Sequence, residues 1–236
     1  MNRKLRKNQQ GFHSLELLLV IAVIVVIGLV GWVVWKKNSS PKLNAAQKVV
    51  QSSCLKSYND TKLCDFGALF TLTNKPYKLV IKTTPKSGSA DTITIESDGN
   101  GGLSYITSSG DIIKSAGTTY VELPNTTTWY RYAAGSTSAP AVTNPGDSLK
   151  PDFKTQAAKK VKYNYISKVS CGTLTCYKYQ EVDPTQTGTT TFFWFDTKNY
   201  RLQSLTSEDS AGATTDMTVS YESVTITAPA TSTLIQ

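Results

Sequence analysis

An uncharged apolar run near the N-terminus is the strongest constraint on how this chain of 236 residues can fold. The segment Leu17–Trp35 reads LLLVIAVIVVIGLVGWVVW and holds 19 residues without a charge. As a helix it would span roughly 28 Å at about 1.5 Å per residue, close to the hydrocarbon core of a bilayer, which is about 30 Å thick. The run therefore predicts a transmembrane helix over residues 12–37.

The charges that flank the run predict its orientation. Four basic residues precede the run and three follow it: Arg3, Lys4, Arg6 and Lys7, then Lys36, Lys37 and Lys42. Loops rich in Lys and Arg stay on the cytoplasmic side of a membrane. We therefore expect a single-pass membrane protein with a cytoplasmic leader over residues 1–11 and an exported domain over residues 38–236.

The leader ends in a short motif with a glutamate at the edge of the apolar run. Gly11-Phe12-His13-Ser14-Leu15-Glu16 resembles the processing site of type IV prepilins and pseudopilins. The resemblance implies cleavage after Gly11 by a prepilin peptidase and methylation of Phe12. It also implies that Glu16 pairs with the α-amine of a neighbouring pilin-like subunit. His13 and Ser14 depart from the family's usual Thr and large aliphatic residue. A plain signal-anchor is the alternative, but it leaves Glu16 unexplained, since a carboxylate next to lipid is costly.

The composition of residues 38–236 predicts a strand-rich exported domain that does not bind nucleic acid. From Asn38 onward the chain has 19 Lys and Arg against 16 Asp and Glu, so the overall charge of +8 comes largely from the leader. This balance makes nucleic acid an unlikely partner. The domain is rich in Thr, Ser, Tyr and Gly, which favour strands and turns.

Four cysteines form two local pairs, Cys54/Cys64 and Cys171/Cys176. In an oxidising compartment such pairs form disulfides, and their spacing favours the two local connections over the other two possible connectivities. A four-cysteine zinc site is the competing interpretation, but it normally has more closely spaced ligands.

Hydrophobic periodicity predicts an α+β fold that is mostly antiparallel β. After the transmembrane helix we expect a short helix from Pro41 to about Lys56, with Ser40 as its N-cap, and a second short helix after Pro151 through Ala158. Alternating apolar residues then predict a series of strands, among them Tyr77–Lys82 and Val224–Thr227, and a flexible loop at 134–150. We expect these strands to form a curved, half-barrel-like antiparallel sheet.

The second half of the chain resembles a second family. Phe192-Phe193-Trp194-Phe195-Asp196, then Arg201-Leu202, then Asp209-Ser210-Ala211-Gly212 is similar to the C-terminal half of LolA/LppX-type lipoprotein carriers. The resemblance implies a curved antiparallel sheet over short helices. If that sheet has a concave face, Phe192 and Trp194 are candidates for contact with a lipid or acyl chain, although aromatic strands are more often part of a core.

No residue pattern predicts catalysis, a metal or a cofactor. The only histidine, His13, precedes the apolar run, so the exported domain has no Ser-His or Cys-His pair. One basic stretch is a candidate for contact with an anionic surface polymer, although such stretches are usually solvated faces. Its members are Lys154, Lys159, Lys160, Lys162 and Lys168.

Two functional hypotheses follow. The first is a membrane-anchored pilin-like structural subunit, processed at Gly11-Phe12 and assembled through its apolar helix. The second is a signal-anchored extracytoplasmic binding module whose LolA-like sheet takes a lipid, a lipoprotein or another apolar ligand. Neither is an enzyme.

Overall fold

The computed structural model describes residues 42–70, 72 and 74–235. Leu43–Gln236 is one compact unit. Its helices are α2 (Ala45–Tyr58), α3 (Thr61–Leu69), α4 (Pro145–Ser148) and α5 (Phe153–Ala158). The strands of the first half are β1 (Tyr77–Thr84), β2 (Asp91–Ser97), β3 (Leu103–Ile106), β4 (Ile112–Ser115), β5 (Thr118–Glu122) and β6 (Trp129–Tyr132). Those of the second half are β7 (Lys162–Cys171), β8 (Leu174–Val182), β9 (Thr190–Asp196), β10 (Leu202–Glu208), β11 (Thr214–Ser220) and β12 (Thr233–Ile235).

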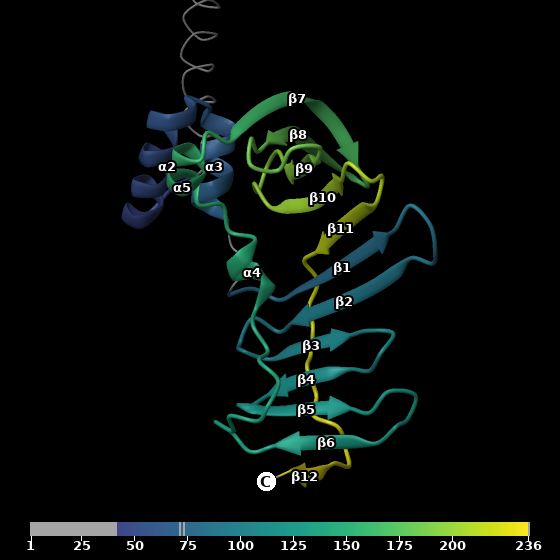
Figure 1. The fold of residues 1–236 in the computed structure, drawn as a ribbon. Coiled ribbons are helices and arrows are strands. Elements are labelled where there is room, and N and C mark those ends of the chain that lie inside the picture. The colour runs from purple at the N-terminus through teal and green to yellow at the C-terminus, as the bar shows by residue number, and fades with distance from the viewer. Residues whose placement is uncertain (1–41, 71, 73, 236) are drawn as a thin grey trace, which may run out of the picture. The chain divides into compact units, whose positions relative to one another are not determined.

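The described strands form one open twelve-stranded sheet, in the order β12-β6-β5-β4-β3-β2-β1-β11-β10-β9-β8-β7 (Figure 1). The sheet consists of two antiparallel meanders, β1–β6 and β7–β11, which join where β1 pairs with β11. Only β12 runs parallel to its neighbour, β6. Since β7 and β12 lie at opposite ends of this order, the strands do not close on one another.

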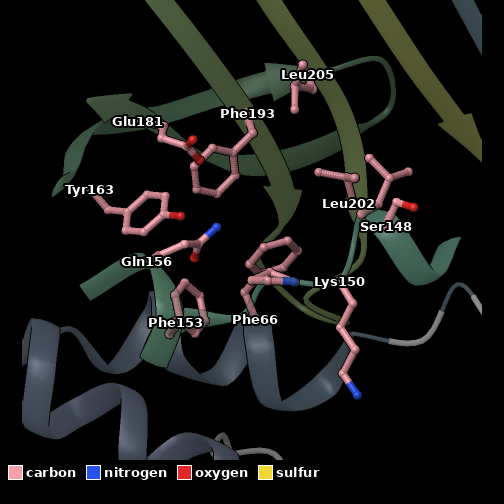
Figure 2. A pocket seen from close by; sticks show the side chains of 12 residues that line it. Phe66, Ser148, Lys150, Phe153, Gln156, Tyr163, Glu181, Phe193, Leu202 and Leu205 are labelled. Carbon is pink, nitrogen blue, oxygen red and sulfur yellow. The ribbon is translucent and has the colours of Figure 1, made fainter. Parts of the chain in front are cut away.

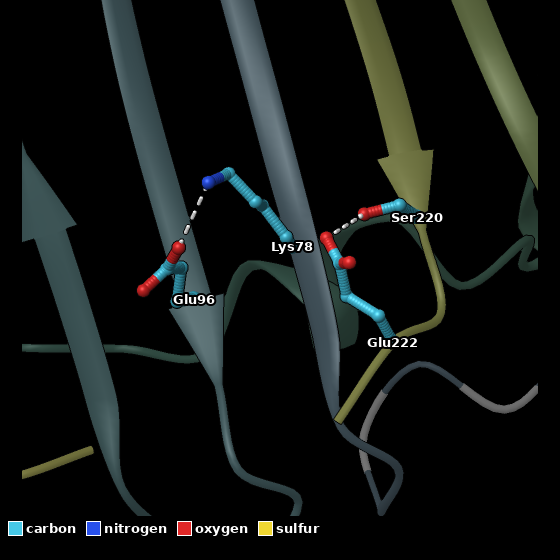
Figure 3. A network of polar contacts seen from close by, with 4 residues as sticks. All are labelled: Lys78, Glu96, Ser220 and Glu222. Atoms are coloured by element: carbon cyan, nitrogen blue, oxygen red, sulfur yellow. Dashed lines mark hydrogen bonds and ion pairs between the residues drawn. The ribbon is translucent and has the colours of Figure 1, made fainter. Parts of the chain in front are cut away.

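The junction of the two meanders carries a cross-strand ion pair. Lys78 on β1 lies opposite both Glu96 on β2 and Ser220 on β11. Its Nζ is 3.1 Å from Glu96 Oε1, and the Ser220 hydroxyl donates to Glu222 Oε1 at 3.1 Å (Figure 3). Both members of the ion pair are partly exposed, so the pair contributes at most about 1 kcal/mol. The pair also joins β1 to β2 within the first meander, so the junction itself is held by the backbone pairing of β1 with β11.

Local capping signals explain the first two helices. Asn44 caps α2 through a capping box with Gln47, so the helix begins after Asn44 and not at Ser40. Asn59 ends α2 in the left-handed conformation, and Asp60 immediately caps α3 by accepting from the backbone N–H groups of Lys62 and Leu63. The predicted helix from Pro41 to about Lys56 corresponds to α2, whereas the sequence pattern does not predict α3.

The two predicted disulfides are confirmed. Cys54 is bonded to Cys64 and Cys171 to Cys176. The first bond joins α2 to α3, and the second closes the hairpin between β7 and β8. Cys54 and Cys64 are both fully buried, whereas Cys171 is partly exposed. The first disulfide therefore belongs to the core.

The predicted fold class is wrong in its helices and in the form of its sheet. The described residues contain four helices rather than two, of which α2 and α5 correspond to the predicted helices, and an open sheet rather than a half-barrel-like one. The predicted strand at Val224–Thr227 has no regular secondary structure, because this segment connects β11 to the distant β12. The predicted loop at 134–150 contains α4.

The predicted single-pass membrane location is corrected as well. Among residues 42–70, 72 and 74–235, no helix is long and apolar enough to cross a bilayer. The 14-residue α2 would span only about 21 Å. The predicted transmembrane helix over residues 12–37 lies outside the described residues, as do Gly11, Phe12 and Glu16.

Removing the two disulfides should have unequal effects on stability. In the chain-entropy model, replacing Cys54 and Cys64 together by Ala lowers the free energy of unfolding by about 3 kcal/mol, and replacing Cys171 and Cys176 together by about 2 kcal/mol. Urea denaturation of the two double variants measures the difference. A larger loss for the Cys171/Cys176 variant would contradict the assignment of the first disulfide to the core.

Candidate functional site

An aromatic cluster docks α3 on the sheet. Phe66 on α3 stacks on Phe195 with ring centroids 4.5 Å apart and on Phe193 at 5.8 Å. Tyr179 on β8 stacks on the same two strand residues, at 5.6 Å from Phe193 and 5.4 Å from Phe195. These side chains are buried. Stacked pairs add about 0.5–1.5 kcal/mol each beyond their burial, so the cluster fixes the helix at this point of the sheet.

A charged cap couples the same helix to the sheet. Asp60 Oδ1 accepts from the first turn of α3, and its Oδ2 accepts from the Tyr179 hydroxyl at 2.8 Å. One carboxylate therefore satisfies both a helix terminus and a buried tyrosine. The Cys54–Cys64 disulfide also holds α3. The aromatic cluster, the Asp60 carboxylate and this disulfide together fix the position of the helix.

Between these helices and the sheet lies an apolar cavity of about 180 Å³ (Figure 2). It is lined by residues of α3, of the segment from α4 to α5, and of β7–β10. They are Phe66, Ser148, Leu149, Lys150, Pro151, Phe153, Gln156, Tyr163, Glu181, Phe193, Leu202 and Leu205. An apolar cavity of about 150 Å³ holds a benzene molecule, so this one has room for roughly six to eight carbon atoms.

The rim of the cavity is formed by the segment that links α4 and α5. Asn144 caps α4 and also accepts from the Tyr77 hydroxyl at 2.6 Å, which ties the segment to β1. Gly146 is buried, and a Cβ there would lie 2.9 Å from Leu72 Cβ, so only glycine permits this close approach. Beyond α4 the side chain of Lys150 is exposed and extends away from the ring of Phe66 (Figure 2).

One end of the cavity is polar. Tyr163 on β7 and Glu181 on β8 are direct register partners, and the Tyr163 hydroxyl donates to the Glu181 carboxylate. Burial raises the pKa of Glu181, the bond from Tyr163 lowers it, and the charge of Asp183 raises it further. Burial also raises the pKa of Tyr163, and the negative charge of Glu181 adds to that effect. Among the described residues, the buried Oε1 of Gln156 has no hydrogen-bond partner.

The predicted apolar ligand face lies on the other side of the sheet. Because side chains alternate along a strand, Phe193 and Phe195 face the helices while Phe192 and Trp194 point the opposite way. Lys178 Nζ covers these outer rings, 4.4 Å from the Phe192 centroid and 5.0 Å from that of Trp194. Phe192 and Trp194 therefore do not line the cavity.

The predicted basic patch consists of exposed side chains on α5 and β7. All five are exposed: Lys154, Lys159, Lys160, Lys162 and Lys168. Lys168 Nζ lies 5.5 Å from the Tyr177 ring centroid. Contact of this patch with an anionic polymer stays a prediction. Among residues 42–70, 72 and 74–235, no cluster of three or more His, Cys, Asp or Glu residues could hold a metal ion.

Sequence reasoning missed the residues that line the cavity. The alternation along β9 separates Phe193 and Phe195 from Phe192 and Trp194, but it does not say which pair faces the helices. Gln156 and Glu181 carry no local signal, because their proximity depends on how α5 packs against β8.

No protein-family model matches the sequence, and no curated protein matches it either. Several solved structures are similar in fold. The lipoprotein LppX of Mycobacterium tuberculosis is 12% identical, with a TM-score of 0.44 over 76% of this chain and 99% of LppX. A LolA superfamily protein of Nitrosomonas europaea is 11% identical, with a TM-score of 0.28 over 72% of this chain and 91% of that protein.

A third similar structure is MucB of Pseudomonas aeruginosa, solved in complex with MucA. It is 11% identical, with a TM-score of 0.34, and this chain spans only 58% of its length. The similar structures are LolA/LppX-like, as the second half of the sequence predicts, and the predicted type IV pilin family finds no support among them. At these values the similarity leaves function to be argued from this chain's own residues.

A close contact between α3 and α5 makes a helix glycine indispensable. A Cβ on Gly67 would lie 2.2 Å from Phe153 Cε2. In a solvent-exposed helix, replacing Gly by Ala raises the free energy of unfolding by up to about 1 kcal/mol. At Gly67 the added methyl group overpacks the contact, so the change should instead lower the free energy of unfolding by about 1–3 kcal/mol. Thermal unfolding of Gly67→Ala measures this loss.

The matched control combines Gly67→Ala with Phe153→Leu. If the contact is the cause, the double variant should be more stable than the sum of the two single changes predicts. Strict additivity would show that Gly67 is not limited by Phe153.

The buried carboxyl predicts a pH dependence of stability. Because the folded protein raises the pKa of Glu181 above its ordinary value of 4.5, the folded state holds this proton more tightly than the unfolded state does. The contribution of Glu181 to stability is therefore present at acidic pH and is lost as the pH rises through the folded pKa. Glu181→Gln should gain stability relative to wild type between pH 4 and pH 7, as measured by urea denaturation. A constant difference across this range would contradict the burial of the charge.

Proposed function

We propose that this protein is an extracytoplasmic binding module that takes the apolar part of a small amphiphile or lipid chain into the cavity between α3, α5 and strands β7–β10. The observation that carries the proposal is the cavity itself, which is lined mainly by aromatic and aliphatic side chains. Such a lining disfavours water and favours apolar ligands. The proposal assigns no catalytic step.

The construction of the walls supports a binding role. Phe66 and Phe193 are held by stacking and by the buried sheet, so they form a largely preformed surface. A preformed cavity loses less free energy to ordering when it binds. On the opposite side, Leu149 and Pro151 belong to a segment without regular structure between two short helices, which leaves the rim free to adjust to the ligand.

The disulfides support an extracytoplasmic location. Both bonds are formed in the structure, and structural disulfides persist in oxidising compartments. The protein thus combines an oxidised helical layer with an apolar cavity, a combination suited to carrying or sensing an apolar chain outside the cytoplasm.

Filling the cavity should abolish binding of an apolar probe. Leu205 lines the cavity from β10, whereas the next residue, Thr206, points to the opposite face and bonds to Asp216. The full chain with Leu205→Trp should lose at least tenfold in affinity for toluene, which fits a cavity of this size, since the indole occupies the space of the probe. The matched variant Thr206→Trp should bind as wild type does. Isothermal titration calorimetry measures both, and equal binding by the two variants would sink the proposal.

A further inference from the structure

The inner end of the cavity is polar, in addition to Ser148 and Lys150 at the rim, and its residues Tyr163 and Glu181 belong to a polar row of the sheet. Strand pairing places Tyr163, Glu181, Thr191 and Ser207 in one row across β7, β8, β9 and β10. The next row along the strands contains Tyr179, Phe193 and Leu205. On the inner face of the sheet, a step of two residues along these strands therefore leads from the polar row to the apolar row. An amphiphile in the cavity would meet this boundary.

Within the polar row, the hydrogen-bond donors are already engaged. The Tyr163 hydroxyl donates to Glu181, and the hydroxyls of Thr191 and Ser207 bond to each other at 3.2 Å. Two acceptors remain at this end of the cavity beside the amide N–H groups of Gln156: the other lone pairs of the Glu181 carboxylate and the unpartnered Oε1 of Gln156. A buried acceptor without a partner is costly, so a ligand that donates to it binds more tightly.

The charged group of the lining at the polar end is the Glu181 carboxylate, whereas the lysines of α5 and β7 are exposed, and Lys159 acts on Asp183. Glu181 lies at the polar end, and the negative charge of Asp183 acts on it from the same strand region. Glu181 also acts on the hydroxyls of Tyr58 and Tyr163. The cation of the lining, Lys150, is exposed at the rim and extends away from Glu181 (Figure 2). An anionic head group would therefore be repelled at the polar end, and a cationic one attracted.

From this arrangement we infer that the cavity selects single-chain amphiphiles with a hydrogen-bond donor at the head, a primary ammonium above all, with Glu181 and Gln156 as the groups that bind the head. The inference rests on the proposed function and specifies its ligand class. The apolar chain lies against Phe66, Phe193 and Leu205, and its length is limited to roughly six to eight carbons inside the cavity.

Three probes of equal chain length test this assignment: octylamine, octanol and octanoate. Their heads differ in charge and in donor capacity, and at pH 7 the amine is protonated and the acid ionised. Isothermal titration calorimetry with the full chain should give octylamine the lowest Kd, octanol an intermediate one and octanoate the highest. The Kd of octylamine should be at least tenfold below that of octanoate, because hydrogen bonds between charged groups are the strong ones.

Variants separate the head group's contribution from that of the chain. Glu181→Gln should raise the Kd of octylamine about tenfold and change the Kd of octanol by no more than about twofold, since the amide keeps an acceptor but loses the charge. The circular dichroism spectrum of this variant should match that of wild type, which controls for its folding. Leu205→Trp should abolish binding of all three probes and so identifies signal that comes from the cavity.

The outcomes are distinguishable. If no probe binds, or if Leu205→Trp has no effect, the proposed function itself fails. If all three probes bind in the cavity with equal Kd, or if Glu181→Gln changes all three equally, the cavity binds chains without regard to the head and the inference is overturned. Preference for octanoate that is lost in Lys150→Gln would place an anionic head at the rim and would also overturn it.

Discussion

The stacking of Phe66 on Phe195 and Phe193 is the contact on which the cavity depends. It brings α3 against strand β9 at ring distances of 4.5 and 5.8 Å, and the rest of the helical layer follows from it. Burying a Phe side chain contributes about 1.5–3 kcal/mol, and stacking adds to this. Because α3 is held here, α2 is placed by the Cys54–Cys64 bond. The cavity is the space left between this fixed layer and the sheet.

The cavity lies entirely on the second meander, while the first meander supports its rim. None of the lining residues comes from β1–β6. The first meander contributes through Tyr77, whose hydroxyl donates to Asn144 and so positions α4 and the segment after it. Leu72 and Gly146 add a close contact that only a glycine allows. The first half of the sheet thus supports the rim, and the second half lines the cavity.

The buried Glu181 is an unusual choice for a cavity that is otherwise apolar. Burial disfavours its ionised form, and a buried carboxyl weakens stability unless its partners compensate. Tyr163 supplies one hydrogen bond, but Gln156 leaves an acceptor unpartnered among the described residues. A hydrocarbon lining throughout would be simpler to stabilise. Under the proposed function, this polar end would recognise the ligand's head, and local stability would be exchanged for selectivity.

The sequence by itself determined the two disulfides and most strands of the two meanders, but it missed β12 and predicted a strand at Val224–Thr227 that does not form. Alternation such as that in Tyr77–Lys82 and short turns between apolar runs are local signals, and the cysteine spacings favour local pairs. Tertiary structure alone decided which face of each strand met the helices. Phe192 and Phe193 are neighbours of the same chemical type, so only the docking of Phe66 distinguishes the outer ring from the cavity wall. The parallel pairing of β12 with β6 and the meeting of Gln156 with Glu181 likewise depend on contacts between distant segments, for which a local pattern carries no information.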